Sequence, residues 1–532
     1  MCSGSAAFSV TQRNTESKLS NICDTIDAVI DGCLGRLRVL GLNTKVTAVG
    51  FATFVMCLQG VDINGVEVGD NIMHYGRGGP GVRKGKDVCK EKAGGMEGRY
   101  HDITGTVIHE SYLPPQVWDM KSNRSEEYER VHKLQSVASA AVGRWGRKRS
   151  CPISYSEASW TGLFDWRRKK WAEEVARVLL PEGGTDMLPE VTDFDDTSNL
   201  VPKITEFDST GAKNPYWDRW PELRGTKCRT FLGVGDGAAA NFGSRCGGGG
   251  RVCVTVGTSA AARIVVEDED EDGDGVEEGE GRGKVPEGMW CYRVDGKRRL
   301  VGGALTDGGS VVEWMRGILG LEDDEEFNKV MEEVSSGSGG GEGECSAVPF
   351  FSGERSTGWR GNATAAIVGI TRDTKKADIV RANLEGVAMR IAKIVEPLKR
   401  LSEAGVKPGD GGGSAQPRSA PPPPTTLVAC GTGLDRNRAW RQMICDASGS
   451  RVAALDEGEA TSRGVAILMA ERLGGGGEGR GVESLEGCEW HEVDEGRRRT
   501  FEVKMMEQER AIRALEEGVW GGGRKGGGGS GS

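Results

Sequence analysis

Residues 233–259 hold the side chains of this 532-residue chain that are best suited to chemistry. Asp236 is a single carboxylate among small residues, in the sequence GVGDGAAANFG, and a β-like run at 251–256 then ends in Gly257-Thr258-Ser259. The carboxylate could act as a general base toward a substrate hydroxyl, because the glycines around it admit a substrate. The turn could bind phosphate oxygens through its backbone N–H groups and hydroxyls. Together they favour phosphoryl transfer to a small hydroxylated substrate.

Each half of this stretch also has an ordinary structural interpretation. Asp236 could cap a helix that starts at Gly237, and Gly257-Thr258-Ser259 could be a plain hairpin turn. GVGDGA also matches a relaxed dinucleotide-binding pattern, which requires an acid about twenty residues later. No Asp or Glu lies between Asp236 and Glu267, so the dehydrogenase interpretation is disfavoured. No G-x-x-x-x-G-K-[ST] sequence occurs anywhere in the chain.

Composition restricts the compartment and the partners. The net charge of −10 and the pI of about 5.4 argue against nucleic acid or an anionic membrane as the main partner. Fourteen scattered cysteines without a C-x-x-C pair indicate a reducing compartment. Five scattered histidines without H-E-x-x-H disfavour a catalytic transition metal. No apolar run approaches the length of a membrane span, so we expect a soluble cytoplasmic protein.

The elements that must position these residues alternate between strands and helices. Strands are expected at 45–54, 251–256, 261–266 and 426–429, and helices at 21–39, 126–145 and 379–401. Pro397 is expected to kink the last helix. Alternating strands and helices indicate an α/β fold, with two domains at this length.

Six segments are rich in Gly, Pro or charge, and we expect them to be surface inserts or tails without a packed core. They are residues 76–98, 267–288, 335–344, 405–424, 474–481 and 521–532.

Further motifs give the chain a specific resemblance. They are PFFSGERSTGW (349–359), AAIVGITRDTKKADIVRANLE (365–385), ACGTGLDRNRAWRQMICD (429–446) and EATSRG (459–464). With GDGAAANFG, VTVGTS and GGALTDGG (302–309), their order and spacing resemble the FGGY carbohydrate kinases, in particular gluconokinase-like and xylulokinase-like members. The resemblance extends from about residue 20 to residue 472.

The resemblance implies a two-domain actin-like, hexokinase-like (ribonuclease H-like) ATPase fold. The N-terminal domain would span residues 1–246 with an insert at 76–98. The C-terminal domain would span 250–472 with inserts at 267–288, 335–344 and 405–424, and a Gly-rich, charged extension would follow at 473–532. The family's first strands carry Asp-x-Gly-Thr, and no such motif precedes Asn21, so we expect the N-terminal domain to be incomplete.

The resemblance also implies the site and its ligands. Asp236 would be the catalytic base and a substrate contact, and Gly257, Thr258 and Ser259 would contact ATP phosphates. The nucleotide pocket would be lined by Gly302, Gly303, Gly431, Thr432 and Gly433. ATP and Mg²⁺ would be the cofactors, with no protein ligand assigned to the metal.

The partners implied are a small sugar or sugar acid and ATP, with no nucleic acid and no membrane. A homodimer is left open.

Two functions remain open from the sequence. The first is a kinase acting on a sugar or sugar acid, such as gluconate or the pentulose xylulose. The second is a catalytically impaired homologue that binds nucleotide or sugar, or serves as an interaction protein, because Val55-Met56-Cys57 stands where relatives place substrate contacts.

Several side chains of these motifs have structural interpretations that we favour over catalysis. Glu354 and Arg355 would form an ion pair between elements, Trp359 and Trp440 would pack, and Glu385 would be structural.

Overall fold

The computed structural model describes residues 18–520, apart from 43–45, 70–72, 74–77, 196–199, 226–227, 249, 269–283, 337–344, 405–424, 456–457 and 475–483. The expected inserts or tails at 405–424 and 521–532 therefore lie outside the described residues. Most of those at 267–288, 335–344 and 474–481 lie outside them too.

The N-terminal half is built around one parallel pair of strands, β1 (Ala48–Thr53) and β8 (Arg229–Gly235). Thr53 lies opposite Gly235, so both carboxyl ends meet at the same edge. Helix α6 (Val137–Trp145) packs on these strands, and α1 (Leu19–Val39) packs on α6. This arrangement places the loop after β1 beside the residue that follows β8.

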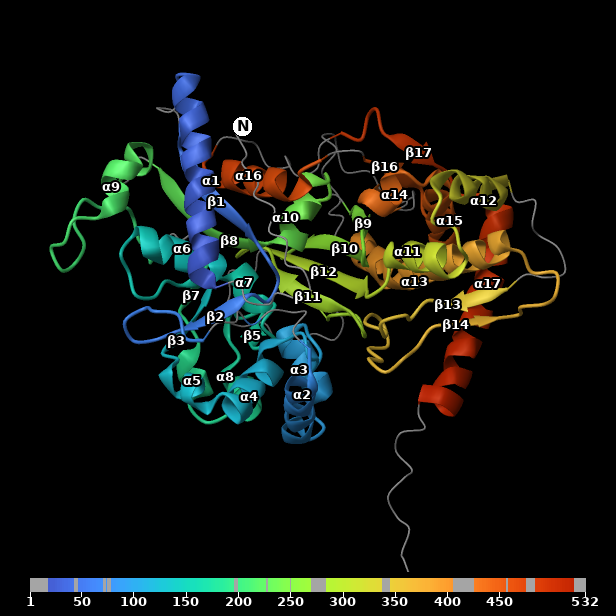
Figure 1. Ribbon diagram of the computed structural model, residues 1–532, viewed down its shortest axis with the longest axis horizontal. Coiled ribbons are helices and arrows are strands. Elements are labelled where there is room, and N and C mark those ends of the chain that lie inside the picture. The colour runs from blue at the N-terminus through green and yellow to red at the C-terminus, as the bar shows by residue number, and fades with distance from the viewer. Residues whose placement is uncertain are drawn as a thin grey trace, which may run out of the picture.

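Short elements complete this half of the chain (Figure 1). They are β2 (Leu58–Val61), α2 (Pro80–Ala93), α3 (Glu97–Thr104), α4 (Leu113–Asn123), α5 (Ser125–Arg130), β3 (Lys133–Ser136), β4 (Ile153–Ser154), α7 (Tyr155–Ser159), β5 (Phe164–Asp165), β6 (Lys170–Trp171), α8 (Glu173–Leu179), β7 (Val191–Thr192), α9 (Pro215–Arg219) and α10 (Asp236–Gly243).

A seven-stranded mixed sheet forms the centre of the C-terminal half, in the order β11-β12-β10-β9-β15-β16-β17. Its strands are β9 (Val252–Val256), β10 (Ala260–Glu267), β11 (Trp290–Arg293), β12 (Arg298–Leu305), β15 (Leu427–Cys430), β16 (Val452–Ala454) and β17 (Glu489–His491). β15 runs parallel to both β9 and β16, and the other pairs are antiparallel. The carboxyl ends of β9 and β15 therefore lie side by side.

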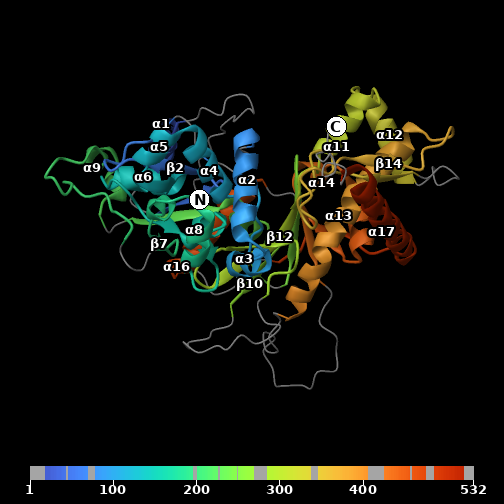
Figure 2. The same ribbon diagram turned by 90° about the horizontal axis from the view of Figure 1, so that it is seen from below.

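Helices cover both faces of this sheet. On one face α13 (Lys376–Ala404) packs against β9, β10 and β12, with α11 (Ser310–Ile318), α12 (Asp324–Ser336) and α15 (Arg438–Ser448) beside it. On the other face α10 contacts β10, and α16 (Ala460–Arg472) contacts both α10 and β1. Figure 2 shows the N-terminal half on one side of these strands and α13 and α17 (Glu495–Leu515) on the other. The remaining strands are β13 (Ser346–Val348) and β14 (Ala366–Val368), and the remaining α-helix is α14 (Thr432–Asp435).

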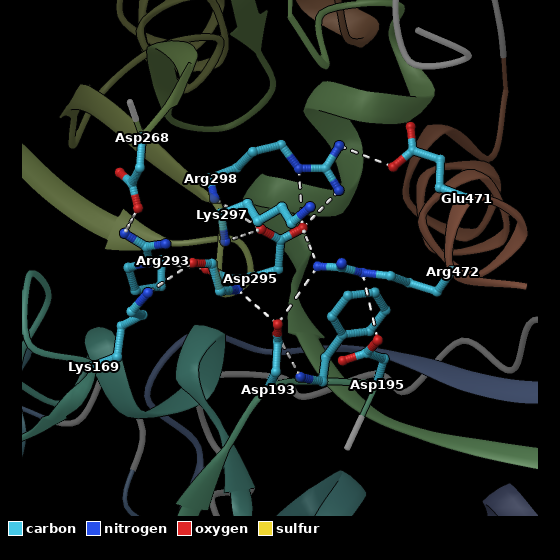
Figure 3. A network of polar contacts seen from close by, with 12 residues as sticks. Lys169, Asp193, Asp195, Asp268, Arg293, Asp295, Lys297, Arg298, Glu471 and Arg472 are labelled. Carbon is cyan, nitrogen blue, oxygen red and sulfur yellow. Dashed lines mark hydrogen bonds and ion pairs between the residues drawn. The ribbon is translucent and has the colours of Figure 1, made fainter. Parts of the chain in front are cut away.

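An ion-pair network ties α16 to two loops from the two halves (Figure 3). Arg472 lies 3.5 Å from the Asp193 carboxylate and 3.2 Å from the Asp295 carboxylate. Arg298 holds Asp295 from the other side, at 2.6 Å. The segment around Asp193 and the β11–β12 turn are thereby joined at the end of α16.

Most of the expected elements are confirmed. The four expected strands appear as β1, β9, β10 and β15, and the expected helices at 21–39 and 379–401 appear as α1 and α13. Pro397 lies inside α13. A kink there stays a prediction.

Two expectations about local structure are wrong. The 126–145 segment is no single helix, because β3 separates α5 from α6 and pairs with β2. The segment 76–98 was expected to be an insert without a core, but residues 80–93 form α2. Val82 and Cys89 on this helix are buried, and α2 packs against α4. The domain boundaries and the incompleteness of the N-terminal domain stay predictions.

Candidate active site

Asp236 is the first residue of α10, directly after β8 ends at Gly235. The helix cap is Gly235, and the Asp236 carboxylate accepts a hydrogen bond of 2.6 Å from the backbone N–H of Gly237. Asp236 therefore does not cap a helix starting at Gly237. The end of β8 and the start of α10 aim its carboxylate from the strand edge where β1 also ends.

The surroundings of Asp236 act on its ionisation in opposite directions. Burial raises the pKa of the carboxyl group, while the positive charge of Arg263 and the Gly237 N–H lower it. Cys57, in the loop after β1, lies close enough for Asp236 to help raise its thiol pKa, which burial takes to about 12. Cys57 is thus a protonated, apolar neighbour of the carboxylate.

The Gly257-Thr258-Ser259 turn joins β9 to β10 as a hairpin. The side chains of Thr258 and Ser259 are exposed, whereas Val256 and Ala260 at the two strand ends are buried. The hairpin rests on the start of α11, because the N–H of Gly309 donates to the Gly257 carbonyl at 2.6 Å. This contact fixes the turn and leaves its hydroxyls accessible.

The Gly431-Thr432-Gly433 segment lies beside this hairpin, at the carboxyl end of β15. Gly431 has a φ of +97°, and a Cβ there would lie 2.7 Å from the Val256 carbonyl oxygen, so a side chain would clash with β9. Thr432 is exposed. The structure therefore brings the predicted residues 257–259 and 431–433 together.

Gly302 and Gly303 lie apart from these loops. Both are buried within β12, opposite Arg263 and Ala262 of β10. A Cβ on Gly303 would meet the side chains of Ile394, Ser356 and Met289 at 2.9 to 3.0 Å. Their position requires small residues for packing, and their assignment to the nucleotide pocket stays a prediction.

Comparison with known proteins identifies a family that part of the chain matches. Residues 252–471 match the family model described as "FGGY family of carbohydrate kinases, C-terminal domain". The chain is related to the FGGY carbohydrate kinases. The resemblance predicted from the motifs is thus confirmed.

Curated relatives of this chain extend the match into the N-terminal half. The chain is 25% identical over 392 residues to a gluconokinase of Bacillus subtilis, an alignment that covers 71% of this chain and 66% of that relative. The chain thus spans slightly less than two thirds of that gluconokinase.

Solved structures of FGGY kinases confirm the expected two-domain actin-like fold. A gluconate kinase from Lactobacillus acidophilus superimposes with a TM-score of 0.72 at 17% identity, covering 95% of this chain and 90% of the other. A Plasmodium falciparum glycerol kinase, solved with ADP, gives a TM-score of 0.69 at 18% identity, with 93% and 89% covered.

One charged residue of the site was missed in the sequence. Arg263 lies on β10, and its Nη1 is 3.5 Å from Oγ1 of Thr255 on β9. Its Nε would lie 3.4 Å from a Cβ on Gly237, so the side chain runs along the start of α10. The available signal was one arginine inside the apolar run AAARIVV directly after the turn.

Glu354 forms a buried ion-pair cluster, but its partner is not the expected one. Its carboxylate lies 2.6 Å from Arg360 and 2.6 Å from Arg390 of α13. The expected pairing with Arg355 is therefore wrong, although the structural role is supported.

The other motif side chains also have structural contacts. Glu385 pairs with Lys504 of α17 at 2.8 Å. The indole N–H groups of Trp359 and Trp440 donate to backbone carbonyls at 2.9 Å each, which supports their interpretation as packing residues.

The described residues carry none of three features: a metal-binding cluster, a disulfide bond or a membrane-spanning helix. They contain no cluster of three or more His, Cys, Asp or Glu side chains arranged to hold a metal ion. No disulfide bond joins the cysteines among them. No described helix is long and apolar enough to cross a membrane.

Proposed function

We propose that this chain is an ATP-dependent carbohydrate kinase that transfers the γ-phosphate to a hydroxyl of a sugar or sugar acid. The observation that carries the proposal is the placement of Asp236. It directly precedes Gly237, along which the Arg263 side chain runs, and the charge of Arg263 lowers the pKa of the carboxyl group. Arg263 reaches β9 near its end, where the exposed hydroxyls of the 257–259 hairpin lie next to the 431–433 loop. Phosphoryl transfer requires such a base beside groups able to bind phosphate oxygens. Gluconate and the pentulose xylulose are the substrates we propose first, from the relatives that the chain resembles.

The residues present fit a nucleoside triphosphate. The hairpin and the 431–433 loop combine glycine backbone with exposed hydroxyls of Thr258, Ser259 and Thr432, which suit phosphate oxygens. ATP would supply the phosphoryl group there. Mg²⁺ commonly binds through substrate phosphates with only one or two carboxylates, so the described residues need not form a cage for it.

Asp236 would orient the acceptor hydroxyl and take its proton as the new bond forms. Because burial raises the pKa of Asp236, the carboxylate form is reached at a higher pH than for a free aspartate. Turnover should therefore rise with pH along an acidic limb that reports on this group.

The proposal is tested by an ADP-release screen with gluconate, xylulose, glycerol and other sugars and sugar acids. Asp236→Asn should lower kcat by about 10²–10⁴-fold on the best substrate, the usual contribution of a general base. Glu173→Gln is the matched control, because Glu173 is an exposed carboxylate in the first turn of α8. It should leave turnover unchanged.

Two results would count against the kinase. Equal turnover by Asp236→Asn would remove the base assignment. Tight nucleotide or sugar binding by the wild-type chain without turnover on any acceptor would instead support the impaired-homologue function. The cytoplasmic location and the dimer stay predictions.

A further inference from the structure

Arg263 stands out by where its charge is placed. It is the one cation in the apolar part of β10. Its neighbours in the strand, Ala262 and Ile264, face one side of the sheet and are buried in the core against α13. Arg263 projects to the opposite face, along the backbone of Gly237. A guanidinium is costly to desolvate, so a half-buried one at a strand centre normally has strong partners.

Arg263 has few protein partners in the part of the chain that the structure describes, and none of its nitrogen atoms is among the buried polar atoms without a partner, so these groups are open to solvent or to a ligand. Among the described residues, its side chain makes one hydrogen bond, the 3.5 Å contact with Thr255. Its charge also acts on Asp236, whose pKa it lowers, yet no carboxylate oxygen in the described residues lies within ion-pair distance of it. A guanidinium carries five N–H donors, and most of those on Arg263 have no described protein acceptor. Such a group is prepared to bind an anion.

The position distinguishes between two possible anionic groups. Asp236 contacts the hydroxyl that receives phosphate in the proposed function, and the Arg263 side chain lies along Gly237, the residue that follows Asp236. In a sugar acid phosphorylated at its terminal hydroxyl, the carboxylate lies at the opposite end of the molecule. The sugar-acid carboxylate would therefore lie far from Asp236. The phosphoryl group in transfer is the anion that lies close both to Asp236 and to β9, the strand that leads into the hairpin.

We propose that Arg263 is a catalytic residue whose guanidinium binds the oxygens of the phosphoryl group during its transfer. This inference rests on the proposed kinase function. The acceptor oxygen forms a bond to the γ-phosphorus while the bond from that phosphorus to the β–γ bridging oxygen breaks, and its electron pair leaves with ADP. The hydroxyl proton passes to Asp236. Arg263 offsets the charge spread over the transferring group, a role in which arginines contribute large rate factors.

The test compares Arg263→Ala and Arg263→Lys with the wild-type chain on one neutral sugar and one sugar acid. Arg263→Ala should lower kcat by about 10²–10³-fold on both, as for other donors that stabilise transition-state charge. The KM for each acceptor should change by less than about threefold, because the contact forms in transfer and not in the ground state. Added guanidinium ion should partly restore the Ala variant, and Lys should be intermediate because it lacks the planar fork.

Arg299→Ala is the matched control, because Arg299 lies on the neighbouring strand β12 and faces Asp268 at 3.6 Å. It should leave kcat near the wild-type value. Circular dichroism and the thermal midpoint check that both alanine variants fold. A higher KM for the sugar acid alone, with kcat on the neutral sugar unchanged, would overturn the proposal and make Arg263 a carboxylate-binding residue.

A second measurement separates this inference from the kinase function. ADP binding is measured by calorimetry with and without fluoroaluminate, which mimics a transferring phosphoryl group. Wild type should bind ADP more tightly with fluoroaluminate, and Arg263→Ala should lose that gain while binding ADP alone equally well. Absence of turnover by the wild-type chain refutes the proposed function. A fluoroaluminate gain that is absent from wild type, or that persists in Arg263→Ala, refutes the role of Arg263.

Discussion

Gly464→Ala should push α16, which connects the two halves, away from α10, which carries the candidate base Asp236. Gly464 of α16 lies so close to α10 that a Cβ there would be 1.7 Å from the Ala239 carbonyl oxygen. The contact is reciprocal, because a Cβ on Gly243 would be 1.7 Å from the Ala460 carbonyl oxygen. Backbone atoms face backbone atoms on both sides, so no side-chain rotation relieves the clash.

The magnitude follows from this distance. A Cβ needs at least about 3.2 Å to a carbonyl oxygen, so the helices must separate by about 1.5 Å. Overpacking of this kind costs about 1–3 kcal/mol or more. The intrinsic helix preference of Ala over Gly returns about 1 kcal/mol of that. Because both backbones are fixed in packed helices, we expect a net loss of about 2 kcal/mol.

The assay is chemical denaturation of Gly464→Ala beside Gly32→Ala. Gly32 lies on the exposed side of α1, and a Cβ there meets nothing within 4 Å. Gly32→Ala should therefore increase the free energy of unfolding by at most about 1 kcal/mol, through helix propensity alone. That increase raises the denaturation midpoint. Gly464→Ala should lower it.

Activity gives a second readout of the same change. Asp236 begins α10, so a shift of that helix displaces the carboxylate from the hydroxyl it serves. A misplacement of about 1 Å can cost about 10²-fold in rate. The reasoning is refuted if Gly464→Ala moves the midpoint upward, in the same direction as Gly32→Ala.

Two further predictions concern the buried charges. Burial and the facing Asp295 raise the pKa of Asp193 from 3.8 to about 6, against the opposing charge of Arg472. The folded chain then holds a proton that the unfolded chain has lost, so this group's contribution to stability falls as pH rises from about 4 to 6, by at most about 3 kcal/mol. Asp193→Asn should flatten that part of the curve of denaturation midpoint against pH, and parallel curves for the two proteins would contradict it. Arg390→Met should destabilise the chain by about 3 kcal/mol, because it leaves the buried Glu354 carboxylate with Arg360 alone. Arg400→Met, at an exposed pair on the same helix, should cost less than about 1 kcal/mol; equal losses in the two variants would argue against the cluster.

The elements that were predictable from the sequence are those in which the spacing of the apolar residues alone shows which side chains are buried. Helix α13 places Val380, Leu384, Val387 and Ile391 on one buried stripe. The apolar run of β9 needs no knowledge of its partners to be identified as a strand. For such segments the local pattern and the tertiary environment agree.

The elements that were not predictable depend on distant partners. β3 pairs with β2, about 75 residues earlier in the chain, and no local pattern between α5 and α6 indicates that contact. Helix α2 has a composition typical of a surface loop, yet it packs against α4 and α8, and its Val82 and Cys89 side chains are buried. In both cases tertiary contact overrides local composition.

The candidate site divides in the same way. Asp236 and the hairpin are continuous motifs, so the residue types alone indicated their chemistry. Arg263 follows the hairpin by only four residues, but its relevance depends on which face of β10 it occupies and on the packing of α10 against that face. Neither property can be derived from the run AAARIVV alone.

The charges of Asp236 and Arg263 affect each other. Burial by itself would favour the protonated form of Asp236, which cannot accept a proton from a hydroxyl. The neighbouring Arg263 favours the carboxylate and thus maintains the base. As the hydroxyl proton moves to Asp236, the carboxylate charge disappears, and the field of Arg263 is left to act on the phosphoryl oxygens. One cation can therefore stabilise the ionised base before transfer and the transferring group during it, which is why Arg263→Ala should both raise the pKa of Asp236 and lower kcat.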